Sequence, residues 1–277
     1  MISSAQSIAI LGGGSLATSI FAGLRRAHAT FADVRVTTRS PGSATGWREL
    51  GVPAVATEDD PSANKDAVRH ADLVLAAVKP AQTPALVSEI ADSLRPGAVV
   101  VSLAAGVRCA TLEDLLPEEV GVIRAMPNTP AAVGAAMTGL SRGAHATDAQ
   151  LEHTAAFFRL VGEVLVVEEA QMDAFAAVAG SGPAYVFYFI EQYTRAAATL
   201  GFDQEQARVL AERTFAGATE LLISSGAEPA ELRRRVTSPK GTTERAVAKL
   251  EEAELEALFT RAAAAAIERA RELSQAV

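Results

Sequence analysis

Short apolar runs alternate with stretches of helical periodicity over the first part of the chain. The runs of strand length are Ser7–Leu11, Val34–Thr38, Leu73–Val78, Ala98–Leu103, Gly121–Arg124 and Val164–Val167. Between the first two, apolar residues recur with helical spacing over Leu16–Ala27. Strands that are apolar throughout and separated by helices predict a parallel sheet with both faces covered. The expected fold class is therefore a doubly wound α/β arrangement.

From about Glu169 the pattern becomes wholly helical. We expect helical segments at Glu169–Leu200 with a break at Gly180–Pro183, from an N-cap at Asp203 to about Ser224, and at Glu228–Arg235, Thr242–Leu250 and Glu254–Gln275. The sequence thus predicts two domains, an α/β domain over residues 1–168 and an all-α domain over residues 169–277. A helical region this long and apolar needs a partner surface, which a second copy of the chain supplies most simply.

Composition and charge narrow the functional class. Of the 277 residues 49 % are hydrophobic, which excludes a disordered chain, and the net charge of −8 argues against nucleic-acid binding. No run approaches the ~20 apolar residues of a membrane span, and the N-terminus lacks the layout of a signal peptide. The lone cysteine, Cys109, favours a reducing compartment, so we expect a soluble, cytoplasmic protein. The histidines show no ligand spacing, and no metal site is expected.

A glycine-rich turn follows the first strand. Gly12, Gly14 and Ala17 fit the pattern G-x-G-x-x-G/A, with Ser15 and Leu16 between them. Small residues here allow a tight turn, close approach of a pyrophosphate and close packing of the helix, whose N-terminus favours phosphate. The alternative is a plain tight turn. Its position at the first strand–helix junction favours the dinucleotide interpretation.

The end of the second strand indicates which coenzyme binds. NAD sites usually carry an acid there, whereas this chain has Arg39 and Ser40. A guanidinium beside a hydroxyl suits a 2′-phosphate, which favours NADPH, with NADH as the weaker alternative. The competing interpretation is an arginine in a solvated loop.

Five further segments, in this order, carry a family resemblance. They are Ala77–Pro80, Ser102–Gly106, Arg124–Pro130, Ala179–Tyr185 and Val236–Thr243. Together they resemble the pyrroline-5-carboxylate reductase family over nearly the whole chain. The resemblance implies a Rossmann-type domain followed by a helical dimerisation domain, in homodimers that can assemble into decamers. It also implies the reduction of 1-pyrroline-5-carboxylate to L-proline, the last step of proline biosynthesis.

The resemblance further implies positions for the site residues. Those bordering the cofactor are Asn64, Val78, Lys79, Pro80, Ala105 and Gly106. Those at the substrate are Glu169, Ser181, Ser238, Gly241, Thr242 and Thr243. Two positions depart from the family pattern: Ser15 stands where Asn is frequent, and Lys240 where Gly is usual.

The loop Ser238–Thr243 suggests how a small anionic imine would be held. It runs into a helix predicted to begin near Thr242, so its N–H groups and the helix dipole favour a carboxylate. Thr243 can place a hydroxyl beside the ring nitrogen, which makes it the candidate catalytic residue. The alternative is that Thr242 or Thr243 only caps the helix.

Other candidates have structural alternatives of equal or greater weight. Arg124 is expected to tie loops together rather than to bind a carboxylate. Glu169 is also explained by its place at a helix start, Ser181 by a helix kink, and Cys109 by packing.

Two rival functions remain open at this stage. One is an imine reductase or hydroxyacid dehydrogenase of similar build, against which the loop Ser238–Thr243 argues. The other is a non-catalytic dinucleotide-binding protein such as a redox sensor, which would need no substrate loop.

Overall fold

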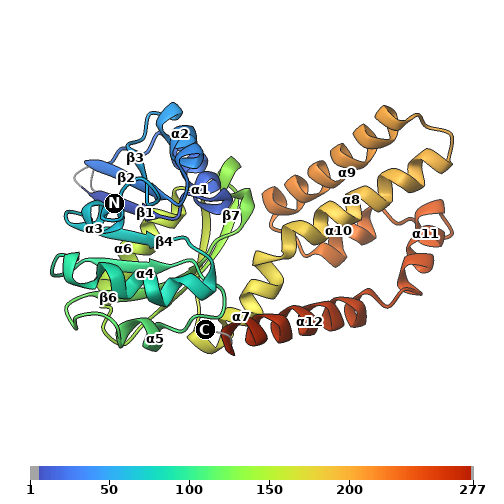
Figure 1. Ribbon diagram of the computed structural model, residues 1–277. Helices are drawn as coiled ribbons and strands as arrows, with labels where there is room; N and C mark the ends of the chain where they lie inside the picture. Colours follow the sequence, from blue (N-terminus) through green and yellow to red (C-terminus); the bar gives the residue numbers. More distant parts are fainter. Residues whose placement is uncertain (1–5, 276–277) are drawn as a thin grey trace. The chain divides into compact units, whose positions relative to one another are not determined.

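The computed structural model describes residues 6–275 of the chain. It forms two compact units, one of residues 1–181 with 265–277, the other of residues 182–264 (Figure 1). The break between Ser181 and Gly182 falls inside the predicted helical region. The predicted domain boundary between residues 168 and 169 stays a prediction.

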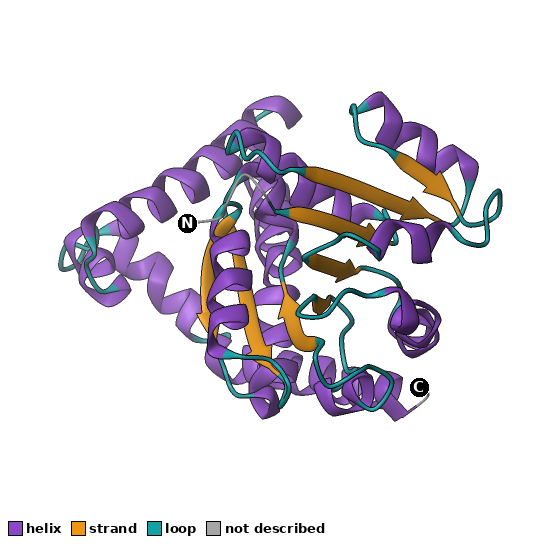
Figure 2. Ribbon diagram, turned by 90° about the vertical axis from the view of Figure 1, so that its left-hand side faces the viewer, coloured by secondary structure: helices purple, strands orange, loops and turns teal. Residues whose placement is uncertain are grey.

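The first unit is built on one sheet with strand order β3-β2-β1-β4-β5-β6-β7-β8. The strands are β1 (Ser7–Leu11), β2 (Asp33–Thr38), β3 (Ala54–Ala56), β4 (Leu73–Ala76), β5 (Val99–Ser102), β6 (Gly121–Met126), β7 (Ala136–Arg142) and β8 (Gly162–Val166). Neighbouring strands run parallel except for the pair β6 and β7 (Figure 2). The carboxyl ends of β1, β2, β4 and β5 therefore share one edge of the sheet.

Helices cover both faces of this sheet. They are α1 (Ser15–Arg26), α2 (Pro41–Glu49), α3 (Ala63–Val68), α4 (Thr83–Ile90), α5 (Cys109–Glu113) and α6 (Asp148–Arg159). Strand β1 shows the two faces directly, because Ile8 and Ile10 belong to one buried cluster and Ala9 and Leu11 to the other. Such alternation in a wholly apolar strand confirms the doubly wound arrangement.

Two strands were not expected from the sequence. β3 has only three residues, too few for a recognisable run. β7 is nearly all buried but contains Thr138, Gly139 and Ser141, so it shows no continuous apolar pattern. Gly139 is required by packing, because a Cβ there would lie 2.7 Å from the ring of Phe175. The expectation of a purely parallel sheet was wrong at this strand, which runs antiparallel to β6.

At the start of β8 the backbone of Gly162 lies close to the backbone of Ala136. Gly162 has φ +151°, and a Cβ there would lie 2.1 Å from the carbonyl oxygen of Ala136. After β8 come a short 3₁₀ turn η4 (Glu169–Gln171), the helix α7 (Met172–Phe175) and a π-helical segment η5 (Ala176–Gly180). The expected break near Ser181 is thus a change from π to α geometry.

The helical unit consists of α8 (Gly182–Thr199), α9 (Gln204–Ser225), α10 (Pro229–Arg235), α11 (Thr242–Glu251) and the first part of α12 (Leu255–Gln275). Asp203 caps α9 as predicted, its Oδ1 accepting a 2.8 Å hydrogen bond from the N–H of Gln206. Aromatic rings pack between the helices, with Tyr193 and Phe215 5.7 Å apart and Phe189 and Phe259 5.8 Å apart.

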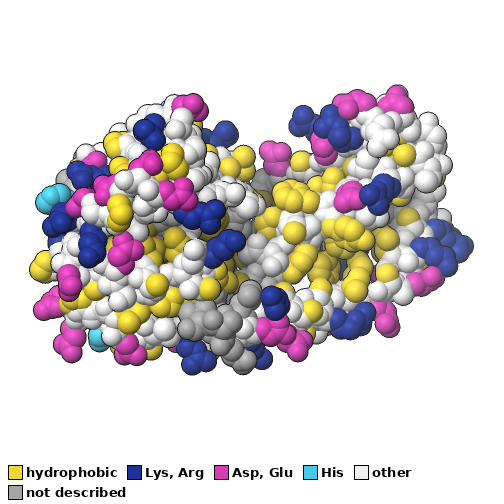
Figure 3. Space-filling view, in the orientation of Figure 1, with side chains coloured by type: hydrophobic (Ala, Val, Ile, Leu, Met, Phe, Trp, Pro, Cys, Tyr) yellow, Lys and Arg dark blue, Asp and Glu magenta, His cyan; other side chains and the backbone are white. Residues whose placement is uncertain are grey.

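Large apolar side chains of this unit remain exposed (Figure 3). They include Phe187, Tyr188, Leu200, Leu221 and Ile223. Exposed apolar area on this scale is typical of a surface that another chain covers. No described helix is both long and apolar enough to cross a membrane.

Candidate functional site

The glycine turn lies at the carboxyl edge of the sheet, between β1 and α1. The N–H groups of Gly12 and Gly13 donate to the carbonyl oxygen of Thr37, at 3.0 and 2.9 Å. Gly12 has φ +93°, and a Cβ there would lie 2.8 Å from Cγ1 of Val78. Only glycine fits this position, because both the backbone conformation and the approach of Val78 exclude a side chain.

Gly14 is open where Gly12 is crowded. It is the N-cap of α1, and a Cβ on it would meet no other described atom within 4 Å. Ser15 beside it is exposed, Leu16 is half-buried, and Ala17 is buried against the core. The first turn of α1 carries no acidic residue. Free space before an uncapped helix N-terminus fits a phosphate group.

Arg39 and Ser40 follow β2 at the same edge. The Arg39 side chain is 85 % exposed, and its only described ion pair is a 3.9 Å approach of Nε to Glu58. Ser40 is the N-cap of α2, and its backbone carbonyl accepts a hydrogen bond from the Thr38 hydroxyl. Glu58, which was not predicted from the sequence, thus lies near Arg39 without a hydrogen bond to it that would compete with an anionic ligand.

Asn64 is buried near this edge of the sheet and is not exposed on it. Its Oδ1 accepts a 2.7 Å hydrogen bond from the hydroxyl of Thr37, and its Nδ2 donates to the carboxylate of Glu89. Both ends of the Asn64 amide are therefore bonded. Asn64 holds the side chain of Thr37, whose backbone carbonyl accepts the two N–H groups of the glycine turn. Its contact with a cofactor stays a prediction.

The remaining predicted cofactor residues follow β4 and β5. Val78 touches the glycine turn, and Lys79 is exposed just before the 3₁₀ turn η1 (Pro80–Gln82). After β5, Ala105 is half-buried and Gly106 is buried with φ +77°. The structure thus brings the glycine turn, the end of β2 and these two loops to one edge of the sheet, where a doubly wound fold binds its ligand.

A buried arginine organises the region of Glu169. Arg124 on β6 is 3 % exposed, and it donates from Nη1 to Oε1 of Glu169 at 3.3 Å and from Nη2 to Asp173 at 3.4 Å. The prediction that Arg124 ties segments together is confirmed by these bonds. Its Nε is buried without a hydrogen-bond partner among the described atoms.

The same oxygen of Glu169 accepts the backbone N–H of Cys109. Burial, and after it the negative charge of Glu169, raise the pKa of the Cys109 thiol to about 12. A thiol of this kind is not a nucleophile at neutral pH, in agreement with the packing interpretation.

The predicted carboxylate loop lies in the helical unit. Gly241 is the N-cap of α11, so neither Thr242 nor Thr243 caps the helix and that alternative was wrong. Both threonines are exposed. Lys240 has φ +61°, a left-handed conformation that favours glycine. This accounts for the usual glycine at this position, from which Lys240 departs.

Two contacts shape this loop. The N–H of Lys240 donates to the Glu244 carboxylate at 2.8 Å, and the N–H of Gly241 to the carbonyl of Ser238 at 3.0 Å. A Cβ on Gly241 would lie 2.5 Å from the Ser238 hydroxyl. Glu244, which the sequence analysis did not single out, therefore fixes the loop at the start of α11.

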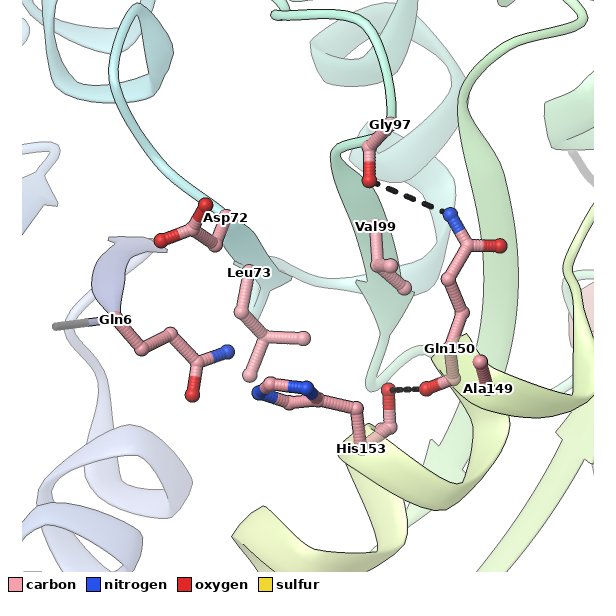
Figure 4. A pocket seen from close by; sticks show the side chains of 9 residues that line it. Gln6, Asp72, Leu73, Gly97, Val99, Ala149, Gln150 and His153 are labelled. Carbon is pink, nitrogen blue, oxygen red and sulfur yellow. Dashed lines mark hydrogen bonds between the residues drawn. The ribbon is translucent and has the colours of Figure 1, made fainter. Parts of the chain in front are cut away.

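A separate cavity of about 370 Å³ lies at the opposite edge of the sheet (Figure 4). Its lining includes Gln6 and Asp72, which immediately precede β1 and β4, and Gln150 of α6, whose amide donates to the carbonyl of Gly97. It thus lies at the amino ends of the strands, away from the glycine turn, and is not the candidate site.

Known proteins resemble the chain along its whole length. Residues 169–273 match the family model for pyrroline-5-carboxylate reductase dimerisation, and residues 7–106 that for NADP oxidoreductase, coenzyme F420-dependent. Pyrroline-5-carboxylate reductase of Pseudomonas aeruginosa is 40 % identical over 269 residues, which are 97 % of this chain and 97 % of the relative.

Solved structures of pyrroline-5-carboxylate reductases are also similar to the chain. That of a pyrroline-5-carboxylate reductase from Coxiella burnetii has a TM-score of 0.86 at 37 % identity, over 96 % of this chain and 98 % of that one. The fold is shared by Plasmodium falciparum pyrroline carboxylate reductase, solved with NADP bound, at a TM-score of 0.84 and 23 % identity over 97 % of this chain and 98 % of that one. Because a relative 40 % identical matches nearly its full length, the chain belongs to the pyrroline-5-carboxylate reductase family.

Proposed function

We propose that this chain reduces 1-pyrroline-5-carboxylate to L-proline with hydride from NADPH, the last step of proline biosynthesis. The observation that carries the proposal is that a member of this family has both an open glycine turn before α1 and a helix start without a side-chain cap at α11. The first suits a dinucleotide phosphate, and the second suits the carboxylate of a small substrate.

The coenzyme proposal rests on the edge built around the glycine turn. Gly12, Gly14, Ser15, Leu16 and Ala17 would form the phosphate cradle, because the space before Gly14 is free. Arg39 and Ser40 would bind the 2′-phosphate, which makes NADPH the preferred coenzyme and NADH the weaker one. Val78–Pro80, Ala105, Gly106 and Asn64 would complete the wall. When bound, the reduced nicotinamide supplies the hydride.

The substrate proposal begins at α11. The N–H groups of a helix's first turn have no partners within the helix, and the positive end of its dipole attracts anions. Ser238, Gly241 and Thr242 would therefore hold the carboxylate of the imine. Glu169 and Ser181 are the other substrate residues proposed, and the Glu169 carboxylate, already held through Oε1 by Cys109 and Arg124, would accept a ring N–H.

Thr243 is the proposed catalytic residue. Reduction adds hydride to the imine carbon and leaves the ring nitrogen with a proton. A hydroxyl both donates and accepts, so it can stay hydrogen-bonded to this nitrogen before and after the transfer. The Thr243 hydroxyl is available because Gly241, and not this threonine, caps α11.

The assembly and compartment follow from the helical unit and from Cys109. Exposed Phe187, Tyr188 and Ile223, 65 %, 61 % and 76 % accessible, need a covering surface, and the dimerisation family model spans this region. We propose a homodimer, with the decamer as a further assembly of dimers. The single buried cysteine suits a reducing compartment, and we propose the cytoplasm.

The activity is tested by following NADPH oxidation by the purified chain. Oxidation should require 1-pyrroline-5-carboxylate and should be much slower with cyclic imines that lack a carboxylate or carry it elsewhere on the ring. The product should be L-proline by chromatography. Oxidation that is faster with another imine or with a 2-oxo acid would reassign the substrate.

The assembly is tested by light scattering at the concentration of the assay. A dimer, or a multiple of it, is expected. A monomer that retains full activity would contradict the proposal.

A further inference from the structure

The helix break before Ser181 places a backbone carbonyl four residues before a proline. The π-helical segment Ala176–Gly180 ends with the N–H of Ser181 donating to the carbonyl of Ala176, five residues back, at 2.9 Å. In an α-helix the carbonyl of Ala179 would accept from residue 183. That residue is Pro183, which has no N–H to give.

Asn128 donates to this carbonyl. It lies between β6 and a 3₁₀ turn (Thr129–Val133), is 8 % exposed, and donates from Nδ2 to the carbonyl of Ala179 at 2.9 Å. Its Oδ1 accepts the N–H of Met137 at 3.0 Å. The amide can adopt only this orientation, because the N–H of Met137 can only donate and the carbonyl of Ala179 can only accept.

Met126, two residues before Asn128, lies near the next residue of the π segment. It is buried at the end of β6, and its side chain would lie 3.8 Å from a Cβ placed on Gly180. The bond from Asn128 thus reaches the π segment two residues before Ser181. π-Helical turns inside α-helices occur frequently at functional sites.

We infer that Asn128 is a positioning residue for the substrate: its carboxamide replaces the N–H that Pro183 lacks and thereby fixes the backbone that presents Ser181. The inference rests on the proposed function, because Ser181 is a substrate residue only there. Asn128 acts through the backbone of Ala179, so its loss moves the substrate residue rather than removing it.

The test is a double-mutant cycle between Asn128 and Pro183. Asn128→Ala should raise KM for 1-pyrroline-5-carboxylate about tenfold, the size of one lost hydrogen bond. The Kd for NADPH should stay within about twofold. In a Pro183→Ala background the backbone N–H of residue 183 is restored, so adding Asn128→Ala should change KM by no more than about twofold.

A second variant guards against misfolding. Asn128→Asp keeps the acceptor for Met137 and, as a carboxylate, turns a second oxygen in place of the donor toward the carbonyl of Ala179, so it should raise KM at least as much as Asn128→Ala does. A merely structural role would lower the melting temperature and the active fraction without moving KM.

Three outcomes overturn the inference. They are a wild-type KM in Asn128→Asp, a lower melting temperature with unchanged KM in both Asn128 variants, and an equal KM increase with and without Pro183. Inactivity of the wild-type chain toward 1-pyrroline-5-carboxylate would instead remove the proposed function, and the inference with it.

Discussion

The carboxylate of Glu169 accepts a 2.7 Å hydrogen bond from the backbone N–H of Cys109, sixty positions earlier in the chain. The bond joins the loop after β5, where two cofactor residues are proposed, to the start of η4. Because Arg124 also binds this carboxylate, three distant segments meet at one oxygen.

Removing both carboxylates around Arg124 should cost more than the sum of the single changes. Either Glu169→Gln or Asp173→Asn leaves one counter-charge for the buried guanidinium and should lower the free energy of unfolding by about 1 kcal/mol. The double variant leaves the buried guanidinium without a counter-charge and should lower the free energy of unfolding by about 3–5 kcal/mol. Urea unfolding at one fixed protein concentration measures all three variants. Additive effects would show that Arg124 does not depend on them.

The thiol of Cys109 should be protected and should make stability depend on alkaline pH. Its pKa is raised from 9.0 to about 12 in the folded chain. Between these values the unfolded chain releases the proton and the folded chain retains it, so the free energy of unfolding falls as pH rises through this window. Cys109→Ala should flatten that fall. Rapid alkylation of the native wild type at neutral pH would contradict the burial argument.

Replacing Lys240 by glycine should stabilise the protein. A non-glycine residue in the left-handed region is strained by roughly 1 kcal/mol, and Lys240→Gly should recover up to about this amount. Lys240→Ala is the matched control, because it removes the same charge and keeps the strain. Thermal unfolding compares the two variants. Equal melting temperatures would mean that the loop adapts without strain.

Loss of the Thr243 hydroxyl should affect catalysis far more than stability. Thr243→Ala should lower kcat/KM by about 10²-fold, the lower end for general acid help, because the imine can arrive already protonated. Since Gly241 is the N-cap, the melting temperature should hardly change. Thr243→Ser keeps the hydroxyl and should recover much of the rate. A variant that melts early and turns over normally at low temperature would show that the residue is structural.

Arg39 should discriminate between the two coenzymes. Arg39→Ala should raise KM for NADPH far more than KM for NADH. The difference between the two increases should correspond to about 1.5–3 kcal/mol, as expected for a lost hydrogen bond to a charged group. Arg35→Ala is the control, since Arg35 lies in β2, which Arg39 directly follows, and pairs with Asp33. Equal effects of Arg39→Ala on both coenzymes would exclude it from 2′-phosphate binding.

The sequence predicts the strands and helices of the fold wherever apolar residues recur with strand or helix spacing. The runs that became β1, β2, β4, β5 and β6 are buried or partly buried strands, the run that became β8 is a mostly exposed one, and Asp203 caps its helix. β7 could not be found in this way, because buried Thr138 and Ser141 and the close approach of Phe175 at Gly139 remove the apolar pattern.

Candidate site positions could be recognised from the sequence where the backbone itself needs a particular residue. The glycine turn and Lys240 both show this, since the structure requires glycine at one and a left-handed backbone at the other. Asn128 was not found, because its role depends on a proline far along the chain. The signal was an asparagine in a turn and a proline after a helix break, and only the fold shows that they belong together.

The crowding of Gly162 against Ala136 also limits how this part of the chain can vary in length. From there to Ser181 the backbone is fastened at Gly162, at Glu169 and again at Ala179. One extra residue in β8 would turn its later side chains to the opposite face of the sheet and displace the next two attachments. We expect related chains to vary this stretch in composition but to keep its number of residues, with insertions confined to exposed turns elsewhere.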